Sequence, residues 1–213
     1  MPDLPAPVTA VATVALGAAL WTLAEYLLHR FAMHHLGGRG IMSREHLEHH
    51  VHSTWHFDRI ALLSWAGVFV TGYLVWLPIG WALASPGVGV ALGTGWVLGY
   101  AFYELQHALA HRRAPRGRYS TFVRRHHFHH HFGHPMANHG VTTGLWDRVF
   151  GTFEDPGVVR VPRRLALPWL LDEDGALLER YEGHYELVGS PDPDERQASL
   201  DRIRAFASLA PTE

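Results

Sequence analysis

Histidine is the residue type in this sequence whose number and spacing could do chemistry. The chain has 18 histidines in 213 residues, and 17 of them lie in two windows, residues 29–56 and 107–139. They form four groups: His29 with His34; His46 with His49 and His50; His107 with His111; and His127 with His130 and His131. Spacings of three and four residues predict that each of the last three groups lies on one face of a helix, within reach of a shared ion. The first pair is five residues apart, about 140° round an ideal helix, so a helix there is expected to end or distort.

Imidazoles gathered in this way favour metal binding. One such pair on a helix is more often structural than ligating, but four groups together need a common cause. Ten neutral imidazoles fill two four- or five-coordinate sites, whereas ten clustered imidazolium ions would repel one another. The chain has no cysteine, so a metal must take nitrogen or oxygen ligands. Imidazole suits iron, zinc, copper and nickel, and the spacing does not choose among them.

Three apolar tracts are expected to position these groups. Residues 8–28 carry one charge, Glu25, and are long enough to cross a hydrocarbon core of about 30 Å. A cleaved signal peptide is the alternative, but the basic residues that usually precede its apolar stretch are missing. Residues 60–84 and 86–105 are the other tracts, with a turn expected at Pro78 and at Pro86-Gly87. We predict an all-α, integral-membrane helical bundle of about three transmembrane helices.

The same spans predict which side the histidines face. With three spans, the first histidine window follows the first span and the second window follows the third, so both lie on one side. That side carries ten arginines, whereas the N-terminal residues and the turn between the last two tracts carry no basic residue. The positive-inside rule then predicts a cytoplasmic helical cap that bears a histidine-ligated di-metal site.

The end of the chain has a different character. We divide the sequence into a membrane-embedded domain, residues 1–155, and a soluble C-terminal tail, residues 156–213, with a closing helix over residues 193–207. A formal net charge of -2 argues against nucleic-acid binding. Nucleotide-binding and serine-hydrolase motifs do not occur in the sequence.

The ordered motifs resemble those of the fatty acid hydroxylase and sterol desaturase superfamily, whose members are histidine-rich membrane di-iron oxygenases. The resemblance covers residues 21–155 and rests on five segments: H-R-x-x-x-H at 29–34, H-x-x-H-H at 46–50, Y-E-L-Q-H-A-L-A-H at 103–111, H-x-x-H-H-F at 127–132 and G-V-T-T-G-L-W-D-R-V-F-G-T at 140–152. Counting back from Gly140 favours ligands at 127, 130 and 131 over His126 and His129, which are then expected next to the site or on the surface. The pattern does not require five further histidines: His35, His52, His56, His134 and His139.

The resemblance implies a metal centre and its cofactors. It implies two iron ions and O2 as co-substrate, with zinc able to replace iron in a purified sample. The implied ligands are His29, His34, His46, His49, His50, His107, His111, His127, His130 and His131. The outer N–H groups of such ligands need acceptors. Acidic residues near the motifs are the candidates: Glu25, Glu48, Asp58, Glu104 and Asp147.

The resemblance also implies an activity, insertion of one oxygen atom into an unactivated C–H bond of a lipid. An acyl chain is the favoured substrate, because segment 140–152 most resembles the fatty acid branch; sterol or carotenoid hydroxylation and desaturation stay open. We expect a separate electron carrier, cytochrome b5-like or ferredoxin-like, with its reductase, since no haem module is recognisable. We also expect a multi-pass protein of a bacterial plasma membrane.

Two functions of other classes are weighed against this one. A histidine-rich metal transporter would place its ligands near the bilayer midplane, whereas these lie at span ends and beyond. A degenerate, non-catalytic member is disfavoured because no core position of the pattern is missing.

Overall fold

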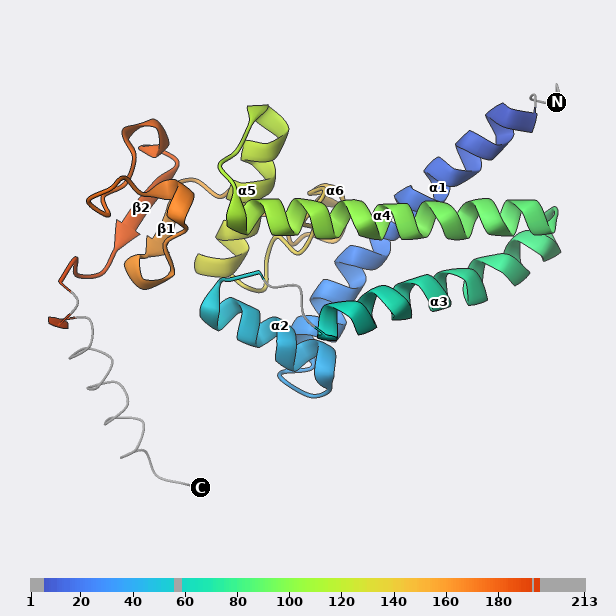
Figure 1. Ribbon diagram of the computed structural model, residues 1–213, viewed down its shortest axis with the longest axis horizontal. Helices are drawn as coiled ribbons and strands as arrows, with labels where there is room; N and C mark the ends of the chain where they lie inside the picture. Colours follow the sequence, from blue (N-terminus) through green and yellow to red (C-terminus); the bar gives the residue numbers. More distant parts are fainter. Residues whose placement is uncertain (1–5, 56–58, 193, 196–213) are drawn as a thin grey trace. The chain divides into compact units, whose positions relative to one another are not determined.

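The computed structural model describes residues 6–55, 59–192 and 194–195 (Figure 1). The chain divides into two compact units, Met1–Pro156 and Gly157–Glu213.

The first unit opens with an apolar helix that changes its winding where the histidines begin. Helix α1 (Ala6–Leu27) continues directly into a π-helix, η1 (Leu28–His35). A π-helix closes its hydrogen bonds between residues i and i+5, so His29 and His34 fall on one face and both are buried. The distortion predicted between these two residues is confirmed.

Two further helices follow η1. A short turn leads into α2 (Ile41–His52), which ends at Ser53 in the left-handed conformation with φ of 51°. Helix α3 (Arg59–Leu83) then runs for 25 residues, with Pro78 inside it. The prediction of a turn at Pro78 is therefore wrong. Apolar helices of this kind tolerate an internal proline where neighbouring groups satisfy the freed carbonyl.

Helices α3 and α4 (Pro86–Arg112) form the expected hairpin. Ser85 caps α4 by accepting a hydrogen bond from the amide of Val88, and Pro86 occupies the first turn. The two helices approach closely at Gly80, where an added Cβ would lie 2.1 Å from the amide nitrogen of Gly89. Glycine is required there because no side chain fits.

Helix α4 also packs along α1 through small residues. A Cβ on Gly17 would lie 2.2 Å from the carbonyl oxygen of Leu92, and one on Gly95 would lie 2.0 Å from that of Val14. This close packing is typical of helices in a bilayer. Nearer the histidines, four buried side chains form a core cluster: Trp21, Tyr100, Tyr103 and Val141.

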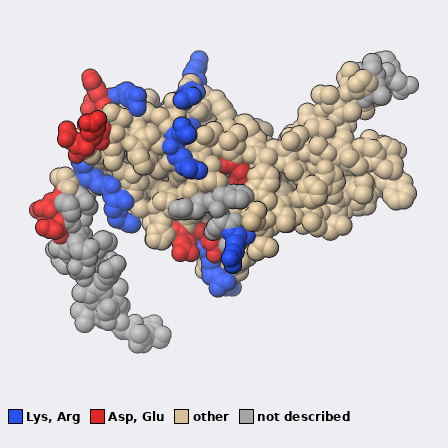
Figure 2. Space-filling view, in the orientation of Figure 1, with Lys and Arg blue, Asp and Glu red and all other residues tan. Residues whose placement is uncertain are grey.

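Among the described residues, two helices are long and apolar enough to cross a membrane: Pro7–His35 and Ala61–Leu83. Their outer surfaces are apolar and exposed; Leu74 is 70% exposed and Leu83 is 77% exposed. Figure 2 shows no charged side chain over the part of this unit that holds the α3–α4 turn. Helix α4 corresponds to the third expected span, but it is not among the helices that meet the same test.

Helix α5 (Gly117–Phe132) follows a short arginine-rich turn, and an irregular segment with the one-turn helix α6 (Leu145–Val149) completes the unit. Arg124 of α5 fixes the end of α4, because its guanidinium donates to the carbonyl oxygens of Leu109 at 2.7 Å and Arg113 at 2.8 Å. A cation that binds the last carbonyls of a helix stabilises that end.

The second unit departs from the all-α expectation. Its strands β1 (Val159–Pro162) and β2 (Tyr185–Val188) pair in parallel, with Val159 opposite Tyr185. Between them lie three 3-10 turns: η2 (Arg163–Leu165), η3 (Pro168–Leu170) and η4 (Glu179–Tyr181). Trp169, Tyr181 and Tyr185 pack edge to face in its core. The closing helix expected over 193–207 lies outside the described residues, except for Asp194 and Glu195, which are helical.

Candidate metal centre

The ten histidines expected to bind metal lie in two groups of five. Site A contains His29, His34, His46, His50 and His130. Site B contains His49, His107, His111, His127 and His131. Within each group, one ring nitrogen of every histidine lies within 4.8 Å of those of the others.

The two sites share helices α2 and α5. Helix α2 sends His46 and His50 to site A but His49 to site B, and α5 divides the motif at 127–131 in the same way. Residues i and i+4 lie above one another on a helix, whereas the residue next to either is turned by about 100°. The expectation that each H-x-x-H-H motif serves one ion is therefore wrong; each motif spans both sites. Only η1 and α4 serve a single site each.

In site A, the Nε2 atoms face one another at nearly constant spacing. His46 Nε2 lies 3.0 Å from that of His29, 2.9 Å from that of His34 and 3.1 Å from that of His50. His130 Nε2 lies 3.0 Å from that of His34 and 3.1 Å from that of His50. Five nitrogens thus point to one small volume.

Site B repeats this arrangement. Nε2 atoms of His107 and His49 lie 2.9 Å apart, as do those of His111 and His127. The rings of His131 and His127 complete the group, with centroids 4.4 Å apart.

Four of these rings are held from behind by main-chain carbonyl groups. Nδ1 of His29 faces the carbonyl oxygen of His139, and Nδ1 of His130 lies 2.7 Å from that of Ala137. In the same way, Nδ1 of His111 and of His49 face the carbonyls at positions 53 and 54, at 3.0 and 2.7 Å. A carbonyl accepts only, so each Nδ1 carries the proton and each Nε2 presents a lone pair.

Five ring nitrogens that converge in each site cannot all hydrogen-bond to one another, and one cation between them would satisfy all five. For nitrogen ligands about 2.1 Å from a metal, two ligands at right angles lie about 3.0 Å apart and two tetrahedral ligands about 3.4 Å apart. The observed spacings of 2.9–3.1 Å match the right-angle arrangement of a five- or six-coordinate ion. The donor sets of both sites therefore fit iron held by imidazoles.

Burial keeps the imidazoles neutral and ready to bind. It lowers the pKa of His50 to about 3, helped by the neighbouring imidazoles of His34 and His49. Burial likewise lowers the pKa of His130 and His131 well below the ordinary value. Both ring nitrogens of His131 are buried without a hydrogen-bond partner, which costs about 1–3 kcal/mol for each group left unsatisfied. A metal ion in site B would satisfy one of them.

Two residues with positive φ shape the carbonyl supports. Ser53 has φ of 51° and Asn138 has φ of 55°. Ser53 offers its own carbonyl to site B, and Asn138 lies between the two residues whose carbonyls hold rings of site A. Non-glycine residues with positive φ are uncommon and cluster at functional sites. Sequence reasoning missed these supports, because any residue supplies a carbonyl; only the Asn at 138 is a signal.

The acidic residues expected behind the ligands stand one step further out. Glu25 accepts from the amide and the hydroxyl of Thr142, at 2.8 and 2.7 Å, and so ties α1 to segment 140–152. Glu104 accepts from the hydroxyl of Tyr100. Glu48 is exposed on α2, and Asp58 lies outside the described residues.

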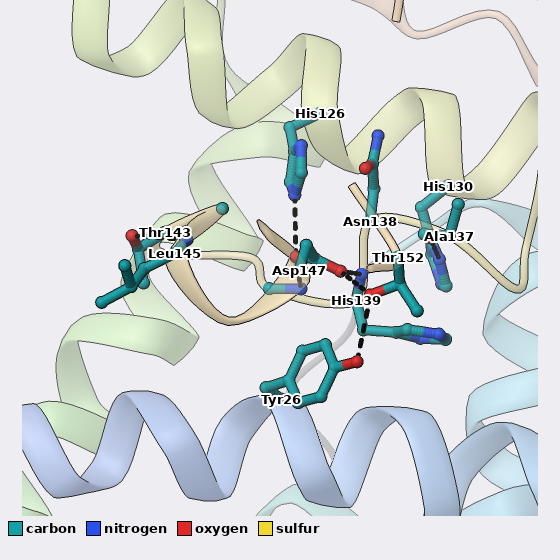
Figure 3. Close-up of polar contacts among 12 residues, drawn as sticks. Tyr26, His126, His130, Ala137, Asn138, His139, Thr143, Leu145, Asp147 and Thr152 are labelled. Atoms are coloured by element: carbon teal, nitrogen blue, oxygen red, sulfur yellow. Dashed lines mark hydrogen bonds and ion pairs between the residues drawn. The ribbon is translucent and has the colours of Figure 1, made fainter. Parts of the chain in front are cut away.

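Asp147 organises the loop that carries the site A carbonyls (Figure 3). Its carboxylate accepts from the amides of His139 and Gly140 at 2.8 and 2.9 Å, from the Thr152 hydroxyl at 2.8 Å and from His126 Nε2 at 3.2 Å. Burial alone would raise the pKa of Asp147, but these hydrogen bonds outweigh it and lower the pKa. Asp147 is therefore a charged anchor.

The remaining histidines lie outside both groups. His126 is buried against Asp147, and His129 and His134 flank the carboxylate of Glu154 at 3.0 and 2.7 Å. The ring of His139 packs within 5.6 Å of three site A rings, between centroids. Four histidines remain: His35 and His52 are exposed, His184 is exposed in the second unit, and His56 lies outside the described residues.

Known proteins resemble the part of the chain that carries both sites. The model of the family described as Fatty acid hydroxylase matches residues 14–152. A ceramide very long chain fatty acid hydroxylase of Schizosaccharomyces pombe, scs7, is 30% identical over 148 residues, which cover 64% of this chain and 41% of that protein. A dihydroceramide fatty acyl 2-hydroxylase of Arabidopsis thaliana is 31% identical over 159 residues, 72% of this chain and 64% of that one. Fatty acid 2-hydroxylase of Homo sapiens is 32% identical over 148 residues, 64% of this chain and 38% of that one.

A solved structure shares the fold. The structure of full-length scs7p, in which only the hydroxylase domain is visible, aligns with a TM-score of 0.53 at 22% identity. The alignment covers 72% of this chain and 59% of that one. The present chain spans 38% to 64% of the length of the three relatives compared above. Because the family model covers well over half of the chain and includes all ten histidines of sites A and B, the protein belongs to the fatty acid hydroxylase family.

Proposed function

We propose that this protein is a membrane-bound di-iron oxygenase that hydroxylates an unactivated C–H bond in the acyl chain of a lipid, using O2 and electrons supplied by another protein. The observation that carries the proposal is the pair of adjacent five-imidazole sites. Bound iron would supply the activation of O2, which protein side chains alone do not perform.

The two sites are close enough to act together. The ring of His50 in site A stacks on that of His131 in site B, with centroids 4.1 Å apart and planes at 9°. His49 and His50 are neighbours on α2 and serve different sites. All ten histidines are the proposed iron ligands, and Asp147 is proposed to position His29 through the main chain of His139.

The surroundings suit a lipid substrate. Helices α1 and α3 are apolar on their exposed sides, and α4 would be the third span, since it packs along both. A groove of about 330 Å³ lies between α1 and α4. It is lined by Ala18, Ala19, Thr22, Leu98, Gly99, Phe102, Thr142 and Thr143. Thr22 precedes His29 by seven residues, about 10 Å along the continuous helix of α1 and η1, so the groove lies close to site A.

The named activities of the relatives narrow the substrate class. Two are named as fatty acyl or fatty acid 2-hydroxylases and one as a ceramide very long chain fatty acid hydroxylase. We therefore place an acyl chain ahead of a sterol or carotenoid, and carbon 2 of the chain is the first position to examine. The arginines beside the histidines favour a plasma-membrane orientation with the metal centre in the cytoplasm.

The test is a reconstituted reaction. The full chain in lipid nanodiscs is loaded with iron and given a ferredoxin with its reductase, NADPH and ¹⁸O2, and acyl products are analysed by mass spectrometry. We expect a hydroxylated acyl chain that carries one ¹⁸O atom. The variant His111→Ala should form no product, whereas His52→Ala, which changes an exposed histidine of α2 outside both sites, should form it normally. A chain with two bound irons that oxidises no lipid would contradict the proposal.

A further inference from the structure

A basic cavity lies on the outer side of helix α5. It measures about 610 Å³ and is lined by Gly117, Arg118, Thr121, Phe122, Arg125, Arg148, Phe153, Asp155 and Pro156. Three arginines against one aspartate give its lining a net charge of +2. Figure 2 shows basic side chains following the first half of α5 on this face of the unit. Arg112 at the end of α4, and Arg113 and Arg116 in the turn before α5, are exposed as well.

The cavity has an aromatic floor. Phe122 and Phe153 line it, and the ring of His126 lies stacked with each of them, at centroid distances of 5.1 and 5.5 Å. Arg148 belongs to the same layer, because its guanidinium carbon lies 3.8 Å from the centroid of Phe153. One layer of aromatic rings therefore separates the basic cavity from His126.

His126 connects this floor to both metal sites. It precedes His127 of site B in the chain, and its Nε2 lies 3.2 Å from the carboxylate of Asp147. The same carboxylate binds the amide of His139, whose carbonyl holds His29 of site A. The chain of covalent and hydrogen bonds from the cavity to each site thus passes through one fully buried imidazole, that of His126.

We propose that this cavity is the docking site for an acidic one-electron carrier protein that contains a haem or an iron–sulfur centre. The inference rests on the proposed oxygenase function. Hydroxylation consumes one C–H substrate, one O2, two electrons and two protons, and yields one alcohol and one water. Two carrier molecules, each oxidised from its Fe(II) to its Fe(III) state, supply the two electrons in turn. The arginines attract the carrier, and the stacked rings place its iron centre near the route to both sites.

Two other occupants fit the cavity less completely. An anionic lipid surface would be attracted by the exposed arginines but would leave the concave aromatic floor without a role. A dinucleotide such as NADPH delivers a hydride, whereas iron accepts single electrons. Both remain distinct outcomes of the test.

The test measures binding without lipid substrate. The iron-loaded full chain in phosphatidylcholine nanodiscs is titrated with the soluble haem domain of cytochrome b5 as the acidic carrier, and with cytochrome c as a basic carrier. We expect the acidic carrier to bind, with an affinity that falls as salt rises, and the basic one not to bind. Arg118→Glu should weaken binding about five- to tenfold. It should slow the oxidation of the reduced haem, followed by its absorbance, by the same factor.

Arg39→Glu is the matched control. Arg39 is exposed in the turn before α2, and it lies outside the cavity lining. An equal loss of binding in Arg39→Glu, or no loss in Arg118→Glu, overturns the docking site. The docking site is also overturned if Arg118→Glu leaves carrier binding unchanged and weakens only the binding of phosphatidylglycerol vesicles or of NADPH. A chain that binds the carrier as expected and still oxidises no lipid would contradict the proposed function but support the docking site.

Discussion

Asp147 holds the main chain of His139 through a hydrogen bond of 2.8 Å from the His139 amide, and the carbonyl of that same residue accepts from Nδ1 of His29. A carboxylate that is not a ligand thus fixes the tautomer and direction of a ring in site A. Such supports are often as important to a metal site as its ligands.

Replacement of this anchor should weaken site A. Asp147→Asn puts an amide N–H2 where an oxygen now accepts, so one main-chain donor faces another donor. We expect the iron affinity of site A to fall about 10- to 100-fold, measured as the iron retained against a series of chelator concentrations. The same exchange at Glu48→Gln, an exposed acid on α2, should leave iron retention unchanged. Equal retention in both variants would remove the anchoring role of Asp147.

Two adjacent histidines of α5 test the register of the ligands. His130 lies in site A, whereas His129 points to the carboxylate of Glu154. We expect His130→Ala to abolish lipid hydroxylation and to reduce bound iron to about one ion per chain. His129→Ala should keep both ions and most activity. The iron-to-protein ratio distinguishes the two variants. The reverse result would show that His129, and not His130, is the ligand.

The spacing of the Nε2 atoms predicts the coordination number. Separations of 2.9–3.1 Å correspond to ligands at right angles rather than at tetrahedral angles. Cobalt(II) bound in place of iron should therefore show the weak visible absorption of five- or six-coordinate cobalt. An intense absorption band typical of tetrahedral cobalt would show that the sites rearrange when a metal binds.

The metal-free protein should lose stability in acid. Burial lowers the pKa of His50 to about 3 and that of His139 to about 4, below the value of about 6.5 for a free histidine. Between these pKa values the unfolded chain binds more protons than the folded chain. The contribution of these histidines to the free energy of unfolding is therefore complete above about pH 6.5 and is lost as the pH falls towards 3. Each such group contributes up to about 1.4 kcal/mol per pH unit. Melting temperatures of the chelator-treated protein from pH 8 to pH 4 should follow this course, with a shallower slope in His50→Gln.

The helix packing predicts a contrast between two glycines. A Cβ on Gly95 would meet the carbonyl of Val14 at 2.0 Å, whereas one on Gly67 meets nothing within 4 Å. Gly95→Ala should force α1 and α4 apart and cost about 1–3 kcal/mol. Gly67→Ala should be neutral, or stabilising by up to about 1 kcal/mol, because alanine favours a helix. Thermal unfolding in one detergent compares the two, and equal melting temperatures would show that the close crossing is not maintained.

The sequence by itself determined the identity of the ten histidines and the helices that carry them. Spacings of three and four residues are local, and so is the apolar length of α1 and α3, so both could be predicted from the chain alone. The five-residue gap between His29 and His34 likewise predicted a distortion, which the structure shows as the π-helix η1.

Only the tertiary structure decided how these residues are divided and supported. The assignment of His49 and His50 to different sites depends on where α2 and α5 lie relative to η1 and α4, which no local spacing encodes. The acceptors behind the rings are carbonyls at positions 53, 54, 137 and 139, and a carbonyl is common to every residue. Asp147 was visible in the sequence as a nearby acid, but its role as the anchor of a loop appears only when that loop folds back against α1 and α5.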